Sequence, residues 1–324
     1  MMASWVEDVI HNSVNVGALL SLVVVIFLCS KIRCKDQLFS SPYFILYGIS
    51  LVVHIINVFI WELFTIWPSN AVIHTMDNII FSYETAFVAF WNLILAINRC
   101  TAFVFPIWHS KIWRSLPLFC LIFFSLLFPV FIYLCLPATI SCILTAVPDN
   151  HCFTTKLQNQ HIITYLNSSF AIASLIIGVS TAIKGFLYHK NKLITAKTVK
   201  FEHRLLFQSI CSTLILIFYW VCLVLDIKSR EAGDETAGKI FKTISDVAYI
   251  IHHGSAIIIL LTLSKAFRYS LINYYRSLFC CKLHKMSDAT TENLPKVSST
   301  VLRSKIPSLP IVTIVCSLSV LIEL

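Results

Sequence analysis

Residues 77–106, DNIIFSYETAFVAFWNLILAINRCTAFVFP, combine an apolar run with a regular series of polar side chains. The polar residues come in pairs spaced seven positions apart: Asp77–Asn78, Glu84–Thr85, Asn92 beside Trp91, and Asn98–Arg99. Because seven residues make nearly two helical turns, the four pairs share one face of a helix. Polar side chains within a bilayer usually face protein or a water-filled cavity. The stretch therefore predicts a membrane helix at the centre of a bundle.

The composition of the whole chain is that of a membrane protein. Of its 324 residues, 57% are hydrophobic and only 13% are charged, whereas a soluble domain carries about 25% charged residues. A net charge of +9 would suit nucleic acid or an anionic membrane surface. The basic residues follow the predicted membrane topology, so no nucleic-acid partner is expected.

Seven apolar runs are long enough for the bilayer core, which needs about 20 residues per helix. They lie near residues 14–30, 42–67, 77–100, 116–137, 161–183, 205–226 and 241–264. The predicted fold is therefore all-α, an integral membrane bundle of seven transmembrane helices. A further apolar stretch at 306–324 has too short an uninterrupted core for a comfortable span, and it is either interfacial or an eighth weak segment.

Basic residues gather on one side of this predicted bundle. Of the 25 Lys and Arg residues in the chain, 20 lie on this side. Three are in the loop after the first span, three at the loop after the third, six in the loop after the fifth, and eight follow the seventh span. The positive-inside rule then places the N-terminus outside and the C-terminus in the cytoplasm. We expect a multi-pass protein of the cell membrane, in contact with the lipid bilayer.

Residues 1–285 are predicted to form the membrane domain, and residues 286–324 a cytoplasmic tail. After the seventh span, residues 265–282 favour an amphipathic helix, since Phe267, Leu271, Tyr274 and Leu278 fall on one face.

Two pairs of cysteines are candidates for modification. Cys280 and Cys281, at the end of the amphipathic helix, are either a palmitoylation site or two free thiols. Cys142 and Cys152 lie in the loop after the fourth span. That loop is predicted to face the oxidising side, where a disulfide between them is plausible.

Aromatic and polar residues toward the outer ends of the spans suit a small-molecule site. The candidates are Trp61, Glu62, Tyr83, Glu84, Phe87, Tyr219, Trp220, Asp246, Tyr249 and His253, with Phe81, Tyr165, Asp226 and His252 beside them. The alternative for the aromatic residues is a place in the core or the interfacial belt. The alternative for the polar residues is contact between helices.

No metal ion or cofactor is predicted, and no enzymatic activity. The chain has eleven histidines, but none shows the H-x-x-x-H or H-E-x-x-H spacing that places two ligands on one helix face. His252 and His253 are adjacent, so their side chains point to different faces of a helix.

The segment NRCTAFVFPIWHSKIW, residues 98–113, resembles the end of the third helix in nematode serpentine chemoreceptors of the class gamma superfamily. Those receptors show an Asn-Arg pair, a proline seven residues after the arginine, and a Lys-Ile-Trp cluster. The resemblance implies a seven-helix receptor that binds a small molecule and signals through a heterotrimeric G protein. It also implies the membrane of sensory neuron cilia as a location.

Carried onto this chain, the resemblance makes Asn98 and Arg99 a signalling switch that faces the G-protein cavity. On charge alone, Arg99 would instead extend into water at the membrane surface. Pro106 would end the helix and start the second inner loop. Lys111, Ile112 and Trp113 would lie along that loop, at the membrane surface.

The chain departs from rhodopsin-like receptors, which share the spacing from arginine to proline. Its second span has His54 and Asn57 where a sodium-binding Asp would be expected, and its seventh span lacks Asn-Pro-x-x-Tyr. The competing hypothesis is a transporter or channel for a small solute, although the chain shows no internal repeat and few interior Gly or Pro residues in its spans.

Overall fold

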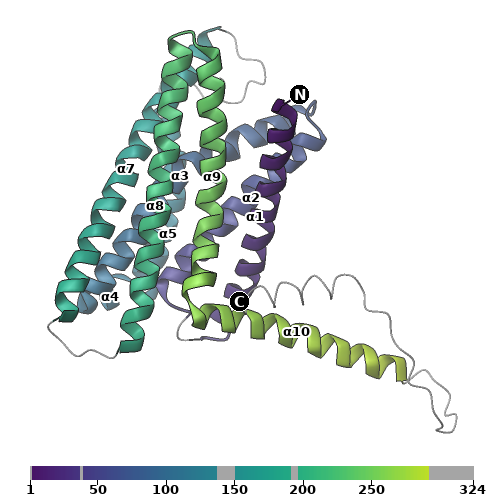
Figure 1. Cartoon of the computed structure of the whole chain (residues 1–324), viewed down its shortest axis with the longest axis vertical. Helices are drawn as coiled ribbons and strands as arrows, with labels where there is room; N and C mark the ends of the chain where they lie inside the picture. Colours follow the sequence, from purple (N-terminus) through teal and green to yellow (C-terminus); the bar gives the residue numbers. More distant parts are fainter. Residues whose placement is uncertain (1, 37–38, 137–149, 191–195, 292–324) are drawn as a thin grey trace. The chain divides into compact units, whose positions relative to one another are not determined.

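The computed structural model describes residues 2–36, 39–136, 150–190 and 196–291. The chain divides into two compact units, Met1–Ser264 and Lys265–Leu324. Every regular element in the described residues is a helix (Figure 1). The helices of the first unit are α1 (Met2–Arg33), α2 (Pro42–Ile66), α3 (Ala71–Val104), α4 (Pro106–Ile112), α5 (Ser115–Cys135), α7 (Asn150–Lys190), α8 (Ala196–Glu231) and α9 (Glu235–Leu263). The second unit contains α10 (Lys265–Thr291).

Seven helices in the described residues contain a segment long and apolar enough to cross a membrane: α1, α2, α3, α5, α7, α8 and α9. Each coincides with one of the runs predicted above, so the all-α fold with seven spanning helices is confirmed. Helices suit this environment because they satisfy their backbone hydrogen bonds internally, where no water is available.

Several helices extend beyond the predicted spans, most clearly where α8 meets α9. The sixth and seventh runs were predicted to end at 226 and begin at 241, but α8 continues to Glu231 and α9 begins at Glu235. Gly233 has a positive φ of 79°, which favours glycine, and the Asp234 side chain accepts a hydrogen bond from the Ala237 backbone N–H. Turn and cap residues, rather than the limits of hydrophobicity, therefore set the ends of these helices.

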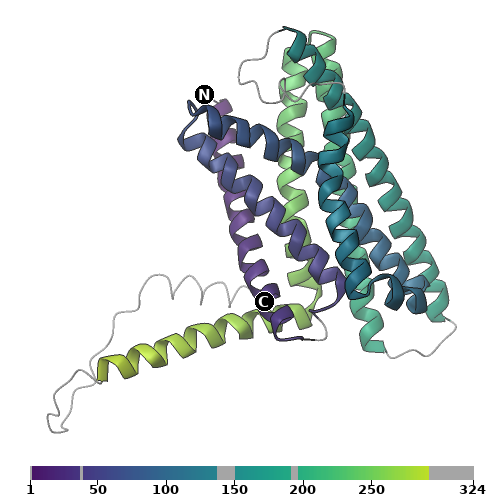
Figure 2. The same cartoon turned by 180° about the vertical axis from the view of Figure 1, so that it is seen from behind.

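Helix α3 is central in the first unit, as its polar stripe predicted. It packs against α2, α5, α7 and α8, while α1 packs against α2 and α9, and α8 lies between α7 and α9. Figures 1 and 2 show α5 on the side of the bundle away from α9. We call the end at which α1, α3, α7 and α9 begin the amino end of the bundle, and the opposite end the carboxyl end.

Small residues bring the inner helices together. Ala89 of α3, Ala171 of α7 and Ala248 of α9 are buried in one cluster with Leu216 and Trp220 of α8. Such residues let helix backbones approach closely, which is how membrane helices gain packing energy without a hydrophobic driving force.

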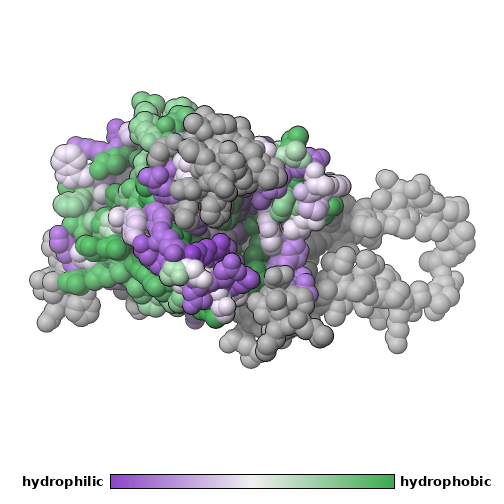
Figure 3. Space-filling view, turned by 90° about the horizontal axis from the view of Figure 1, so that it is seen from above, coloured by the Kyte–Doolittle hydropathy of each residue, from purple (hydrophilic) through white to green (hydrophobic). Residues whose placement is uncertain are grey.

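The flanks of the bundle are apolar. Large hydrophobic side chains such as Phe119, Phe124 and Ile176 are exposed on α5 and α7, as expected of surfaces that contact lipid. Seen from the amino end, hydrophobic residues form the periphery and hydrophilic ones gather on the end face (Figure 3).

The second unit contains one described helix, α10, which covers the range 265–282 predicted to be an amphipathic helix and continues nine residues further, to Thr291. Its amphipathic role at a membrane surface stays a prediction. Cys142, the side chains of Cys152, Cys280 and Cys281, and the apolar stretch 306–324 lie outside the described part of the chain. These three predictions stay predictions.

Replacing Trp91 with Phe should lower stability moderately. The Trp91 indole is 1% exposed, and its Nε1–H donates a hydrogen bond to the Leu46 carbonyl oxygen at 3.0 Å. Loss of this bond between α3 and α2 should cost about 1 kcal/mol, a fall of a few °C in the apparent Tm of purified protein. The control is Trp108→Phe at an exposed position; an equal fall for both variants would contradict this role.

Candidate functional site

The polar stripe of α3 faces the interior of the bundle. Glu84, Asn92, Asn98 and Arg99 are all at most 7% exposed, although they lie in a helix with an otherwise apolar sequence. The Asn92 amide donates to the Thr213 hydroxyl of α8 at 3.0 Å. The interior therefore contains a continuous series of polar groups along α3.

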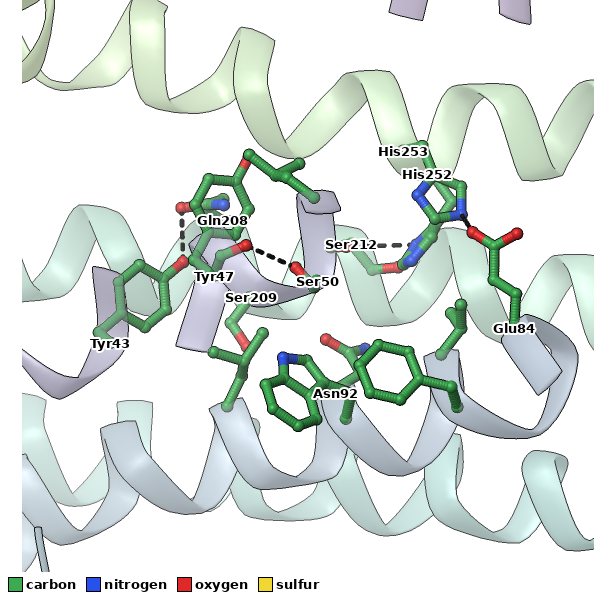
Figure 4. A pocket seen from close by; sticks show the side chains of 15 residues that line it. Tyr43, Tyr47, Ser50, Glu84, Asn92, Gln208, Ser209, Ser212, His252 and His253 are labelled. Carbon is green, nitrogen blue, oxygen red and sulfur yellow. Dashed lines mark hydrogen bonds and ion pairs between the residues drawn. The ribbon is translucent and has the colours of Figure 1, made fainter. Parts of the chain in front are cut away.

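A small cavity of about 60 Å³ lies beside this series, between α2, α3, α8 and α9. Its polar lining residues are Tyr43, Tyr47, Ser50, Glu84, Asn92, Gln208, Ser209, Ser212, His252 and His253 (Figure 4). At roughly 30 Å³ per molecule of liquid water, this volume suits one or two waters or an ion, and it is too small for an organic ligand.

A larger cavity of about 510 Å³ lies near the amino end. It is lined from α3, α5, α7, α8 and α9 by Asn78, Phe81, Ser82, Thr85, Tyr133, Asn159, Gln160, Ile163, Thr164, Tyr219, Trp220, Leu223, Asp226, Ile227, Arg230, Glu231 and Lys242. Small-molecule sites are typically about 300–1,000 Å³, mostly apolar, with a few polar groups that orient the ligand. The larger cavity has this size and this mixture of residues.

Charges at the mouth of the larger cavity are held in pairs. The Arg230 guanidinium donates to the buried Asp226 carboxylate at 2.7 Å, and Lys242 contacts Asp246 at 2.6 Å. A Cβ on Gly238 would lie 3.1 Å from the Arg230 side chain. Helix α9 therefore approaches the first of these ion pairs closely at a glycine.

Two buried polar groups among the lining residues of the larger cavity have no hydrogen-bond partner in the described part of the chain. They are the Asn159 amide oxygen on α7 and the Trp220 indole Nε1–H on α8. An unpaired buried polar group costs about 1–3 kcal/mol. Both atoms are closed off from solvent, so a molecule in the cavity would reach them only after a shift of side chains.

The structure separates the predicted ligand-pocket residues into different places. Glu84, Phe87 and His253 line the small cavity, whereas Tyr219 and Trp220 line the larger one. Tyr249 lies between them, with ring contacts to Tyr219 at 5.7 Å and to His253 at 4.4 Å. The candidates for one small-molecule site therefore fall at two cavities, and the ring of Tyr249 contacts a lining residue of each.

Four other predicted pocket residues line neither cavity. Trp61 and Glu62 contact His11 of α1, the latter at 3.2 Å. The Tyr83 hydroxyl donates to the Leu126 carbonyl oxygen of α5, and Asp246 pairs with Lys242. Each of the four contacts a neighbouring helix or turn, and their place in a ligand site stays a prediction.

Arg99 does not extend into water as its charge alone predicted. It is 3% exposed, and its guanidinium lies 3.7 Å from the centre of the Tyr43 ring of α2. The Tyr43 hydroxyl in turn donates to the Gln208 side chain of α8 at 3.0 Å. Tyr43 thus connects Arg99 on α3 to α8, at the carboxyl end of the bundle.

Pro106 interrupts the chain where it was expected to. Helix α3 ends at Val104, and Pro106 is the first residue of the short helix α4, a position in which its missing N–H costs nothing. Lys111 and Ile112 are exposed, but Trp113 is buried and its indole donates to the Thr101 hydroxyl at 2.8 Å. Trp113 therefore holds α4 against α3 instead of lying on the surface.

Several residues of the interior were not singled out from the sequence. Gln208, Ser209, Ser212 and Thr213 recur on one face of α8, so the periodicity that identified the stripe on α3 could have found them. Asn159 and Arg230, which line the larger cavity, lie near the ends of their spans. Polar residues are expected at the end of any span, so neither their polarity nor their spacing indicates a site.

A comparison with protein-family models found no match, and a comparison with curated proteins found no significantly similar protein. The fold itself defines the class: this is a multi-pass membrane protein with seven spanning helices. The family suggested by residues 98–113 stays a prediction.

Proposed function

We propose that the protein is a seven-transmembrane receptor that binds a small organic ligand and activates a heterotrimeric G protein. The main support for the proposal is that one helix bundle has a ligand-sized cavity at its amino end and a buried arginine, Arg99, at its carboxyl end. Two residues that line the cavity, Asn159 and Trp220, each have a buried polar atom without a partner among the described residues. The positive-inside distribution of basic residues supports an N-terminus outside the cell, so that the larger cavity opens outward.

The two ends of the proposed receptor share helices α3 and α8. Helix α3 lines the larger cavity from Asn78 to Thr85 and carries Arg99. Helix α8 lines it from Tyr219 to Glu231 and carries Gln208, the partner of Tyr43. A ligand that draws α7 and α8 together would change the packing of α8 around Tyr43 and Arg99. Ligands shift such equilibria only by binding one arrangement more tightly.

A ligand of this site would have an apolar body and at least one hydrogen-bonding group. Aromatic residues Phe81, Tyr133, Tyr219 and Trp220 supply the apolar walls, and the pairs Asp226–Arg230 and Lys242–Asp246 can rearrange around a polar group. The proposal also includes membership of the nematode chemoreceptors and a location in sensory cilia. These two parts rest only on the resemblance of residues 98–113.

The proposal can be tested in cells that carry sensors for each class of Gα subunit. The full chain, with an epitope tag at its N-terminus, is expressed and exposed to a panel of small organic molecules. We expect the tag to be accessible on intact cells and at least one compound to evoke dissociation of a G protein. Solute uptake or ion current that depends on the chain, without any G-protein response, would support the transporter or channel instead.

A further inference from the structure

Three residues of the interior come together from three helices: His54 of α2, Glu84 of α3 and His253 of α9. Their ligand atoms all lie within 4.8 Å of one another. The Glu84 carboxylate is 3.1 Å from Nδ1 of His54 and 3.8 Å from Nε2 of His253, and Figure 4 shows the contact between His253 and Glu84. We infer that these side chains form a binding site for a divalent transition-metal ion, with Zn²⁺ as the best match.

The spacing of the ligand atoms fits this ion. A four-coordinate Zn²⁺ with bonds of about 2.0–2.2 Å holds its ligand atoms roughly 3.3 Å apart. The two separations that involve Glu84, 3.1 and 3.8 Å, bracket this value, and the separation between the two histidine nitrogens is at most 4.8 Å. Two imidazoles and one carboxylate are also a ligand set that zinc uses in proteins, with the fourth position left for water. Here the small cavity adjoins Glu84 and His253 and has room for that water.

The electrostatics of the site call for a cation. Glu84 is 2% exposed, and burying an ionised carboxylate is very costly unless it is paired. Among the described residues, its ion-pair contacts are the two histidines and no Lys or Arg. The rings of His54 and His253 are stacked, with centres 3.8 Å apart and planes at 6°. Because the lone pair of an imidazole nitrogen lies in the plane of its ring, one of the two rings must turn out of this stack for both to bind the same metal ion.

An unused coordinating atom supports the same conclusion. In the described part of the chain, Nε2 of His253 is buried without a hydrogen-bond partner, and the Glu84 carboxylate has the Tyr249 hydroxyl as a further polar neighbour. Tyr249 packs its ring against His253 at 4.4 Å and approaches the Asn57 amide at 3.5 Å, which restrains the orientation of His253. A bound ion would join α2, α3 and α9 through one buried group, so it would stabilise their present arrangement.

The test measures metal binding directly and requires no G protein, so its outcome is independent of the proposed receptor activity. The full-length chain is purified, treated with a chelator, placed in lipid nanodiscs and titrated with ZnCl₂ or CoCl₂. We expect about one Zn²⁺ per chain and, with Co²⁺, the intense visible absorption of four-coordinate cobalt. Absence of stoichiometric binding by the unaltered chain would overturn the inference and leave a histidine–glutamate ion pair in its place.

Variants then assign the ligands. His54→Ala, Glu84→Gln and His253→Ala should each weaken zinc binding by more than about 100-fold, since even outer-shell changes cost 10–100-fold. The control, His11→Ala, removes a partly exposed His–Glu pair at 3.2 Å and should leave the affinity unchanged. His253→Cys should retain binding and add a sulfur-to-cobalt charge-transfer band. Undiminished affinity in Glu84→Gln, or no new band in folded His253→Cys, would contradict the assignment.

Discussion

Arg99→Ala is expected to abolish G-protein activation while the protein still reaches the cell surface. The Arg99 guanidinium is buried and stacks on Tyr43 at 3.7 Å, and such a contact contributes about 2 kcal/mol when water is excluded. The Tyr43 hydroxyl in turn donates a hydrogen bond to Gln208 of α8. Removing the guanidinium should therefore loosen α3 from Tyr43 of α2, and so from the residue of α8 that Tyr43 contacts, at the end where the G protein is proposed to bind. The measurement is agonist-evoked G-protein dissociation, normalised to surface expression.

Two further variants sharpen this result. Arg114→Ala removes an exposed arginine that precedes α5, and it should leave signalling intact. Tyr43→Phe keeps the ring beneath Arg99 but removes the hydroxyl that donates to Gln208, so it tests whether the link to α8 is needed. Normal signalling by Arg99→Ala at equal surface expression would exclude the proposed switch.

Trp220→Phe and Asn159→Leu should raise the concentration of agonist needed for half-maximal response about tenfold or more. Each removes a buried polar atom that lacks a partner in the described residues and that belongs to a residue lining the larger cavity. A lost ligand hydrogen bond of about 1.4 kcal/mol corresponds to a factor of ten. The same changes should not destabilise the unliganded protein, because replacing an unpaired buried polar group with an apolar one is neutral or stabilising.

Trp91→Phe supplies the matched control for this prediction. Trp91 and Trp220 are both 1% exposed, but the Trp91 indole already bonds to Leu46. Trp91→Phe should therefore lower the apparent Tm and leave agonist potency unchanged. Trp220→Phe should reduce agonist potency without lowering the apparent Tm. If Trp220→Phe lowers both the Tm and the surface expression with no change in potency, Trp220 is a packing residue and the ligand binds elsewhere.

Hydropathy and periodicity were sufficient to predict the fold. In a bilayer, the need to satisfy backbone hydrogen bonds leaves little choice but helices, so seven runs of the right length gave seven spanning helices. The stripe on α3 also predicted its central position, since polar side chains must face the protein. The ends of α8 and α9 escaped prediction because Gly233 and Asp234, rather than the apolar limit, determine them.

The candidate site was only partly predictable. Glu84, Tyr219 and Trp220 were found because polar and aromatic residues are informative within apolar runs, but the division into two cavities depends on how Tyr219 and Tyr249 pack. The group of His54, Glu84 and His253 was missed because motif searches look for ligands on one helix, whereas these come from three. The stack of Arg99 on Tyr43 likewise depends on tertiary packing that no spacing rule expresses.

Nucleotide exchange by a purified G protein tests the central proposal most directly. The chain, reconstituted in lipid nanodiscs, is mixed with heterotrimers of each Gα class and with a compound that was active in the cell screen. We expect the compound to accelerate GTP binding to at least one Gα with the unaltered chain and not with Arg99→Ala. No acceleration for any Gα, together with solute or ion transport by the same chain in liposomes, would contradict the proposed receptor function.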